Sequence, residues 1–242
     1  MTATTRNSRR SLWRWSKMLA GLLASYLIIA YAILPRVAER NAGRHADLVA
    51  GDKLTKTGNG LPGDPLNLAL VGSDEDVIRA LHAAGWCPAD PLSFESSVRI
   101  SVDTVFKKPD PNAPVSNLFL FGRKEDLAFE KPVGDSPRER HHVRLWRSDK
   151  LDEGRPVWIG AATHDIGVEL SHNTKEVTHR IAPAVDDERD LMIAALTAAK
   201  RVSGIRWIDG FQKKLQGHNG GGDPWHTDGR LPVITLPPSP VD

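Results

Sequence analysis

The stretch RHHVRLWRSDKLDEGRPVWIGAATHD, residues 140–165, decides the fold. In residues 141–147 and again in 157–165, side chains of two kinds alternate along the chain, which is typical of β-strands. The nine residues between them, SDKLDEGRP, have the composition of a turn at hairpin length. The sequence therefore predicts two adjacent antiparallel strands.

Outward from this hairpin, the sequence predicts two helices. One begins after Ser73, a good N-cap with Asp76 as its capping-box partner, and ends at Gly85. The other begins around Asp186 or Asp187, whose carboxylates can cap it, and runs to about Lys200. Its expected buried stripe consists of Leu191, Ala194, Ala195, Ala198 and Val202.

Further strands are expected at 66–71, 117–123, 176–181, 205–211 and 231–238, whereas QGHNGGGDP, 216–224, is expected to be a glycine-rich loop. This order indicates an α+β fold, an antiparallel sheet with two helices packed on one face. The expected organisation is a basic segment 1–17, a transmembrane anchor 18–34, a linker 35–64, the α+β domain 65–236 and a flexible tail 237–242.

The segment MLAGLLASYLIIAYAIL, residues 18–34, contains 17 uncharged residues and follows a basic segment with Trp13 and Trp15. It predicts a single membrane-spanning helix, with the lipid bilayer as partner, and the preceding positive charges favour a cytoplasmic N-terminus. A cleaved signal peptide is the alternative, because Ala30-Tyr31-Ala32 fits the cleavage pattern. Both interpretations carry the following domain across a membrane, to the periplasmic or extracellular side.

Composition excludes several classes of protein. The five basic residues before residue 18 leave 27 basic against 30 acidic residues in the remainder, which disfavours nucleic-acid binding. The single cysteine, Cys87, excludes an internal disulfide framework and a zinc site built from cysteines.

The densest polar cluster lies at the start of the hairpin. His142, Arg144 and Trp146 alternate onto one strand face, and Trp158 and His164 are expected on the corresponding face of the next strand. Such a face would suit an anionic or polar ligand, and the alternative is an ordinary solvated sheet face. The ligand-binding candidates are Arg123, Arg140, His141, His142, Arg144 and Trp158.

Catalysis and metal binding are the sharper alternatives. The candidate catalytic residues are His142, His164, Asp165 and His179, and the candidate metal ligands are His142, His164 and His179. Neither an HExxH motif nor a carboxylate-rich calcium loop is present. His164 and Asp165 are adjacent in a strand and point to opposite faces, which argues against a joint dyad. No cofactor is specified by the sequence.

Five strings together resemble the LssY C-terminal domain family over about residues 65–236: FGRKEDLAFE, RHHVRLW, PVWIGAATHD, THRIAPAVDDERD and WHTDG. This bacterial family has no established activity and often occurs in membrane proteins. By the resemblance, the positions expected to matter are Gly122, Arg123, Asp126, Arg140, His141, His142, Arg144, Trp146, Trp158, Asp165, His179, Asp186, Glu188, Arg189, Asp228 and Gly229.

Two hypotheses of function follow. The first is a membrane-anchored domain on the outer side of a bacterial inner membrane, which acts as a binding or accessory module with an envelope protein as the candidate partner. The second is a hydrolase or metal-dependent enzyme that uses the His/Asp cluster. Histidines that converge on one cleft would favour the second hypothesis, and histidines on separate faces would favour the first.

Overall fold

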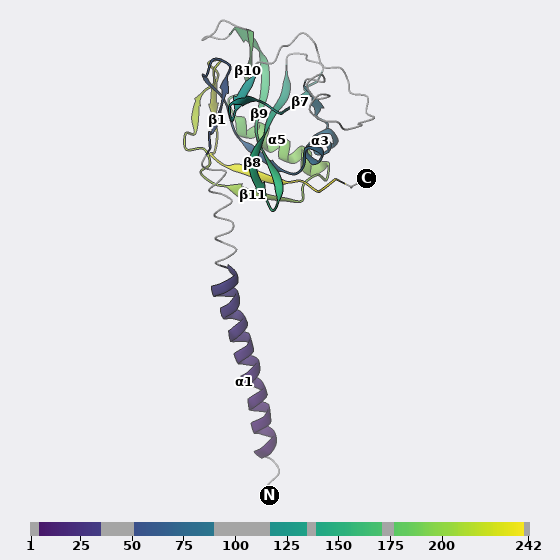
Figure 1. Ribbon diagram of the computed structural model, residues 1–242, viewed down its shortest axis with the longest axis vertical. Coiled ribbons are helices and arrows are strands. Elements are labelled where there is room, and N and C mark those ends of the chain that lie inside the picture. Colours follow the sequence, from purple (N-terminus) through teal and green to yellow (C-terminus); the bar gives the residue numbers. More distant parts are fainter. Residues whose placement is uncertain (1–4, 35–50, 90–116, 135–138, 171–176, 240–242) are drawn as a thin grey trace. The chain divides into compact units, whose positions relative to one another are not determined.

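The computed structural model describes residues 5–34, 51–89, 117–134, 139–170 and 177–239 (Figure 1). The chain divides into two compact units, residues 1–50 and 51–242, which are described separately. In the first unit, helix α1 (Thr5–Ile28) continues into a short π-helix, η1 (Ile29–Ile33). Its part Trp13–Ile33 is long and apolar enough to cross a membrane, and none of it is buried.

The second unit contains an eight-stranded sheet. Its order is β11 (Gly204–Ile208), β14 (Leu231–Thr235), β3 (Leu68–Val71), β9 (Arg155–Leu170), β8 (Arg140–Asp152), β7 (Leu127–Pro132) and β4 (Cys87–Pro88), and β10 (Val177–Ile181) pairs with β9. Every pair is antiparallel except β14 with β3. The predicted hairpin is thus β8–β9, and its turn is only Glu153-Gly154, both with positive φ, as a tight hairpin turn requires.

Two smaller sheets were not predicted. One has the order β2 (Pro62–Pro65), β1 (Leu54–Thr57), β5 (Leu118–Leu120) and β6 (Arg123–Lys124), and the other pairs β12 (Gln216–His218) with β13 (Pro224–His226). Strands β1 and β2 lie in the expected linker, and β12 and the first residue of β13 lie within residues 216–224, which were expected to be a loop throughout. These strands have only three or four residues, and β2, β12 and β13 contain proline or glycine, so their sequences lack the alternation that marks a strand.

Helix α3 (Asp74–Ala83) has the predicted N-terminus. Ser73 accepts a hydrogen bond from the Asp76 backbone N–H, the Asp76 carboxylate accepts one from the Ser73 N–H, and Gly85 follows the helix with φ +81°. Helix α5 (Val185–Ala198) differs from its prediction, because its N-cap, Ala184, makes no side-chain hydrogen bond.

The main apolar core joins α3, α5 and strands of the large sheet. Val77 and Leu81 of α3 and Met192 and Leu196 of α5 are buried in one cluster with strand residues that include Leu70, Phe129, Val143, Leu145, Trp158 and Ile234. The buried side chains of α5 are Val185, Glu188, Arg189, Met192 and Leu196. The expected stripe is wrong, because Leu191, Ala195 and Val202 are only partly buried and Ala194 and Ala198 are exposed. That both helices cover the same face of the sheet stays a prediction.

The face of the large sheet that carries His142 and Trp146 lies within the domain. His142 and Trp146 have no exposed surface, and the Trp146 indole N–H donates to the Arg123 carbonyl of β6 at 3.3 Å. Arg144 is 6% exposed and contacts Asp64 of β2. The small sheet therefore contributes contacts to the face that the sequence analysis expected to be open to ligand.

Candidate functional site

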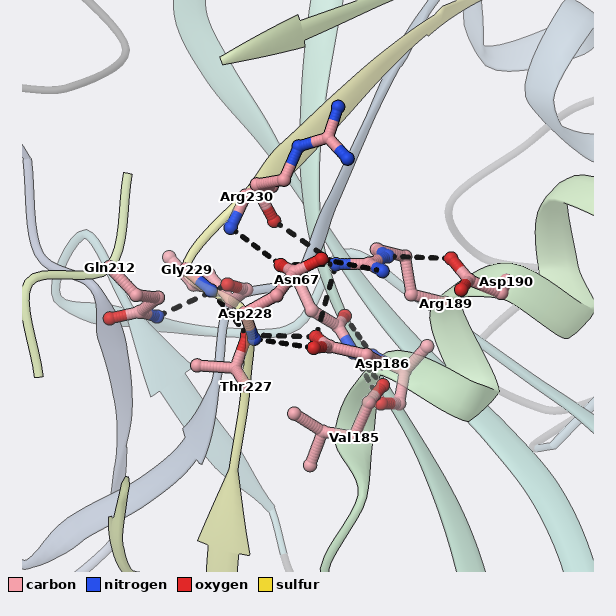
Figure 2. A network of polar contacts seen from close by, with 12 residues as sticks. Asn67, Val185, Asp186, Arg189, Asp190, Gln212, Thr227, Asp228, Gly229 and Arg230 are labelled. Carbon is pink, nitrogen blue, oxygen red and sulfur yellow. Dashed lines mark hydrogen bonds and ion pairs between the residues drawn. The ribbon is translucent and has the colours of Figure 1, made fainter. Parts of the chain in front are cut away.

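The first turn of helix α5 is joined to the large sheet by one buried side chain, Asn67. Its amide N–H groups donate to the Val185 and Ala162 carbonyls, both at 2.9 Å, and its carbonyl oxygen accepts from the Ala162 N–H at 2.9 Å (Figure 2). Asn67 lies just before β3, so its side chain supplies Ala162 of β9 with the hydrogen bonds that another strand residue would give. The turn that carries Glu188 is thereby held against β9.

A second network joins the same turn to the loop that precedes β14 (Figure 2). The Arg189 guanidinium, 4% exposed, binds both carboxylate oxygens of Asp228, at 2.8 and 3.2 Å, and Asp186 at 3.1 Å. Asp186 also accepts a hydrogen bond from the Thr227 hydroxyl at 2.7 Å. Its carboxylate therefore binds this loop rather than capping the helix.

Gly229 completes this loop. Its φ is +83°, and a Cβ on it would lie 2.8 Å from a Leu215 side-chain atom and 2.9 Å from the Gln212 carbonyl oxygen. The loop can therefore approach Leu215 and the Gln212 carbonyl this closely only with glycine at position 229.

These contacts place Glu188 against His141 of β8. The Glu188 Oε2 to His141 Nδ1 distance is 2.7 Å, with the carboxylate side chain 3% exposed and the imidazole 16% exposed. The other carboxylate oxygen, Oε1, is buried and has no hydrogen-bond partner among the described residues. A buried carboxyl thus meets an imidazole that reaches the surface.

Burial and the neighbouring charges change the proton affinity of both groups. Burial, and then the charge of Asp165, raise the pKa of Glu188 to about 8. Burial, and then the His164 and Lys131 charges, lower the pKa of His141. Because the contact is so short, the two groups titrate as a unit. Up to about pH 8 they share one proton, either as two uncharged groups or as a carboxylate beside an imidazolium.

His164 of β9 extends this cluster toward solvent. It lies directly opposite His141 in the β8–β9 register, and the two ring centroids are 4.8 Å apart. Its Nε2 is 3.2 Å from a Glu139 carboxylate oxygen, and the His164 and Glu139 side chains are 26% and 42% exposed. We call Glu188, His141, His164 and Glu139 the His–Glu cluster.

The reverse side of the same strands carries a chain of buried ion pairs. Arg140 contacts Glu130 at 2.9 Å and Asp165 at 3.4 Å, and Arg144 contacts Asp64 at 3.4 Å. Burial raises the pKa of both Asp64 and Asp165, although the Arg144 charge opposes the rise in each case. The guanidinium groups are thus engaged with carboxylates inside the domain.

Comparison with protein-family models matches residues 48–231 to the family described as LssY C-terminus. The chain belongs to the LssY C-terminus family. The match begins before β1, so it includes β1 and β2 within the family domain. Comparisons with curated proteins and with solved structures gave no match.

In this LssY C-terminus domain, the β8–β9 register separates residues that the sequence analysis grouped. His142 lies opposite Thr163, whereas His164 lies opposite His141, so His142 and His164 point to opposite faces of the sheet. Trp158 is on the apolar face, where its indole N–H donates to the Gly72 carbonyl at 3.2 Å. The prediction that His142, Arg144, Trp158 and His164 share one face is therefore wrong. His142 and Arg144 point to one face of the sheet, and Trp158 and His164 point to the other.

The remaining candidates lie apart. Arg123 is exposed and forms a bidentate pair with Asp126 at 2.7 and 2.9 Å. Arg140, by contrast, is buried and binds carboxylates inside the domain. His179 is in β10 opposite Val168, and its side chain lies outside the described part. Among the described residues, no group of three or more His, Cys, Asp or Glu side chains could hold a metal ion.

Sequence reasoning included His141 among ligand-binding candidates but did not pair it with Glu188. One signal was available: Glu188 precedes Met192 and Leu196 by one and two helical turns, on the buried stripe of α5. A carboxylate on a buried stripe requires a polar partner. The identity of that partner depends on how α5 docks, which no local pattern reports.

Proposed function

We propose that this chain is a single-pass membrane protein whose LssY C-terminus domain lies on the periplasmic or extracellular side of a bacterial inner membrane and acts there as a binding or accessory module. The observation that carries the proposal is the helix Trp13–Ile33, a 21-residue apolar segment in which no described residue is buried. At about 1.5 Å per residue it is about 30 Å long, the thickness of a hydrocarbon core.

The orientation rests on charge. Five basic residues precede position 18 without an acidic residue among them, and positive segments stay preferentially on the cytoplasmic side. Trp13 and Trp15 begin the apolar segment, where indole rings favour the membrane interface. Arg36, Arg40 and Arg44 follow the segment and oppose this bias, so a direct measurement of topology is the decisive test.

The experiment uses cysteine labelling in a Cys87→Ser background, since Cys87 is the single native cysteine. A membrane-impermeant maleimide should label Leu151→Cys, at a side chain that is 64% exposed, in intact spheroplasts. It should label Ser8→Cys only after lysis. The reverse pattern would refute the orientation, and a protein that is released from membranes by carbonate would refute the anchor. Intact mass of the purified protein distinguishes a retained anchor from cleavage near Ala32.

A further inference from the structure

The His–Glu cluster has the parts of an acid–base site. We propose that His141 and Glu188 act as an acid–base pair that exchanges a proton with water or a hydroxyl group of an uncharged polar substrate. This activity goes beyond the proposed membrane-anchored module and does not depend on the anchor.

The geometry supplies the first argument. Glu188 holds the Nδ1 side of the imidazole at 2.7 Å, which leaves Nε2 as the nitrogen that can exchange a proton with a substrate. A buried carboxylate that orients imidazole through Nδ1 is the arrangement by which histidine becomes an effective base. The partly exposed imidazole connects this buried carboxylate with the surface.

Chemical balance gives the pair two roles. When the carboxylate is ionised and Nδ1 carries the hydrogen, Nε2 accepts a proton from an oxygen, and that oxygen becomes the stronger nucleophile. The resulting pair holds one more proton and can return it from Nε2–H to a leaving or product oxygen. The raised pKa of Glu188 places the exchange of these two forms near pH 8.

The surroundings favour an uncharged substrate over an anion. The nearby guanidinium groups of Arg140 and Arg144 are at most 7% exposed and bind buried carboxylates on the reverse side of the sheet. The Lys131 ammonium donates to the Ala84 carbonyl at 3.2 Å. The other charged and titratable groups whose charges act on the pair are Lys131 of β7, His164 and Asp165 of β9, and Glu139 in the segment before β8.

The test measures the availability of the His141 nitrogen in the full chain in detergent micelles. Diethyl pyrocarbonate acylates the unprotonated imidazole, and mass spectrometry reports each histidine separately. His226, which is exposed, and His142, which has no exposed surface, serve as internal references. We expect the rate at His141 to rise as Glu188 loses its proton, near pH 8, because Nδ1 then carries the hydrogen and Nε2 is free.

The Glu188→Gln variant keeps the shape of the carboxyl group but cannot take up a proton. Its His141 midpoint should fall by at least about one pH unit, since burial disfavours the imidazolium without a carboxylate partner. Glu75→Gln, at an exposed carboxylate of α3, is the matched control and should leave the midpoint unchanged.

Three results would overturn the proposal: a His141 midpoint that equals that of His226, an unchanged midpoint in Glu188→Gln, or a His141 as unreactive as His142 at every pH. Circular dichroism establishes whether each variant is folded. If Glu188→Gln does not fold, the profile of the wild-type chain decides, because its His141 and His226 midpoints either differ or coincide.

Discussion

Replacing Asn67 by alanine should destabilise the domain strongly, because its buried amide makes two hydrogen bonds to β9 and one to α5. Each of these bonds is 2.9 Å long, and Asn67 is 2% exposed. At about 1 kcal/mol for each bond, and about 1 kcal/mol more for the buried Ala162 N–H that loses its acceptor, the expected loss is about 4 kcal/mol. That is a large share of the roughly 5–15 kcal/mol that stabilises a typical domain.

The assay is urea unfolding of the full chain in detergent micelles, followed by near-ultraviolet circular dichroism. Asn67→Asp is the informative comparison, since it keeps the shape and the acceptor but places an oxygen against the Val185 and Ala162 carbonyls. It should be at least as destabilising as Asn67→Ala at neutral pH. Asn59→Ala, at an exposed turn residue, should change the free energy of unfolding by less than about 0.5 kcal/mol.

A loss below about 1 kcal/mol in Asn67→Ala would refute this account of how α5 is held, because three intact buried bonds cannot be removed at so small a cost. An Asn67→Asp variant as stable as the wild type would refute it as well, since the two donated bonds would then contribute nothing. In either case the position of Glu188 would have to be maintained by the Arg189 network.

Three further results are expected. Gly160→Ala should destabilise the domain by about 1–3 kcal/mol in thermal unfolding, because the new Cβ would lie 2.7 Å from a Leu145 methyl group. Gly204→Ala, which has open space around its Cβ, is the control and should not destabilise the domain. Burial would raise the pKa of Asp76, but hydrogen bonds from the Ser73 and Ser239 N–H groups and from Arg155 outweigh it and lower the pKa to about 2. Its stabilisation, about 2 kcal/mol, is therefore complete above about pH 4 and lost as the pH falls through 2, and urea unfolding of Asp76→Asn should lack this acid-dependent part. Arg189→Lys should destabilise by about 1–2 kcal/mol in urea unfolding, because an ammonium cannot bind both Asp228 oxygens as the guanidinium does; an equal midpoint would contradict this.

The parts of the fold that follow local rules were predictable from the sequence. The β8–β9 hairpin depends on alternation and a turn, and the start of α3 depends on Ser73 and Asp76, which are three residues apart. Strands β1, β2, β12 and β13 were missed although β1 pairs with β2 and β12 with β13 nearby in the sequence, because strands of three or four residues are too short to show alternation. Phe121 shows the same limit: the pattern placed it in a strand, but it is 49% exposed in a turn with φ 53°.

The candidate site was predictable in composition but not in arrangement. His142 and Arg144 resemble the solvated side of a strand, since polar residues on one face usually meet water. In the structure, Arg144 instead contacts a carboxylate of β2, which makes its burial possible. His141 and Glu188 are 47 residues apart, and only the docking of α5 brings them together.

The place of β14 in the sheet has a consequence for how the protein is made. This strand lies between β11 and β3, and its Val233 pairs in parallel with Ala69, so residues near the two ends of the domain sequence meet inside the sheet. A ribosome delivers Leu68–Val71 long before Leu231–Thr235, and until then one edge of β3 has no strand to complete it. Assembly of the sheet must therefore wait for nearly the whole chain, and we expect the domain to fold slowly, with the edge of β3 open to wrong pairing until β14 arrives.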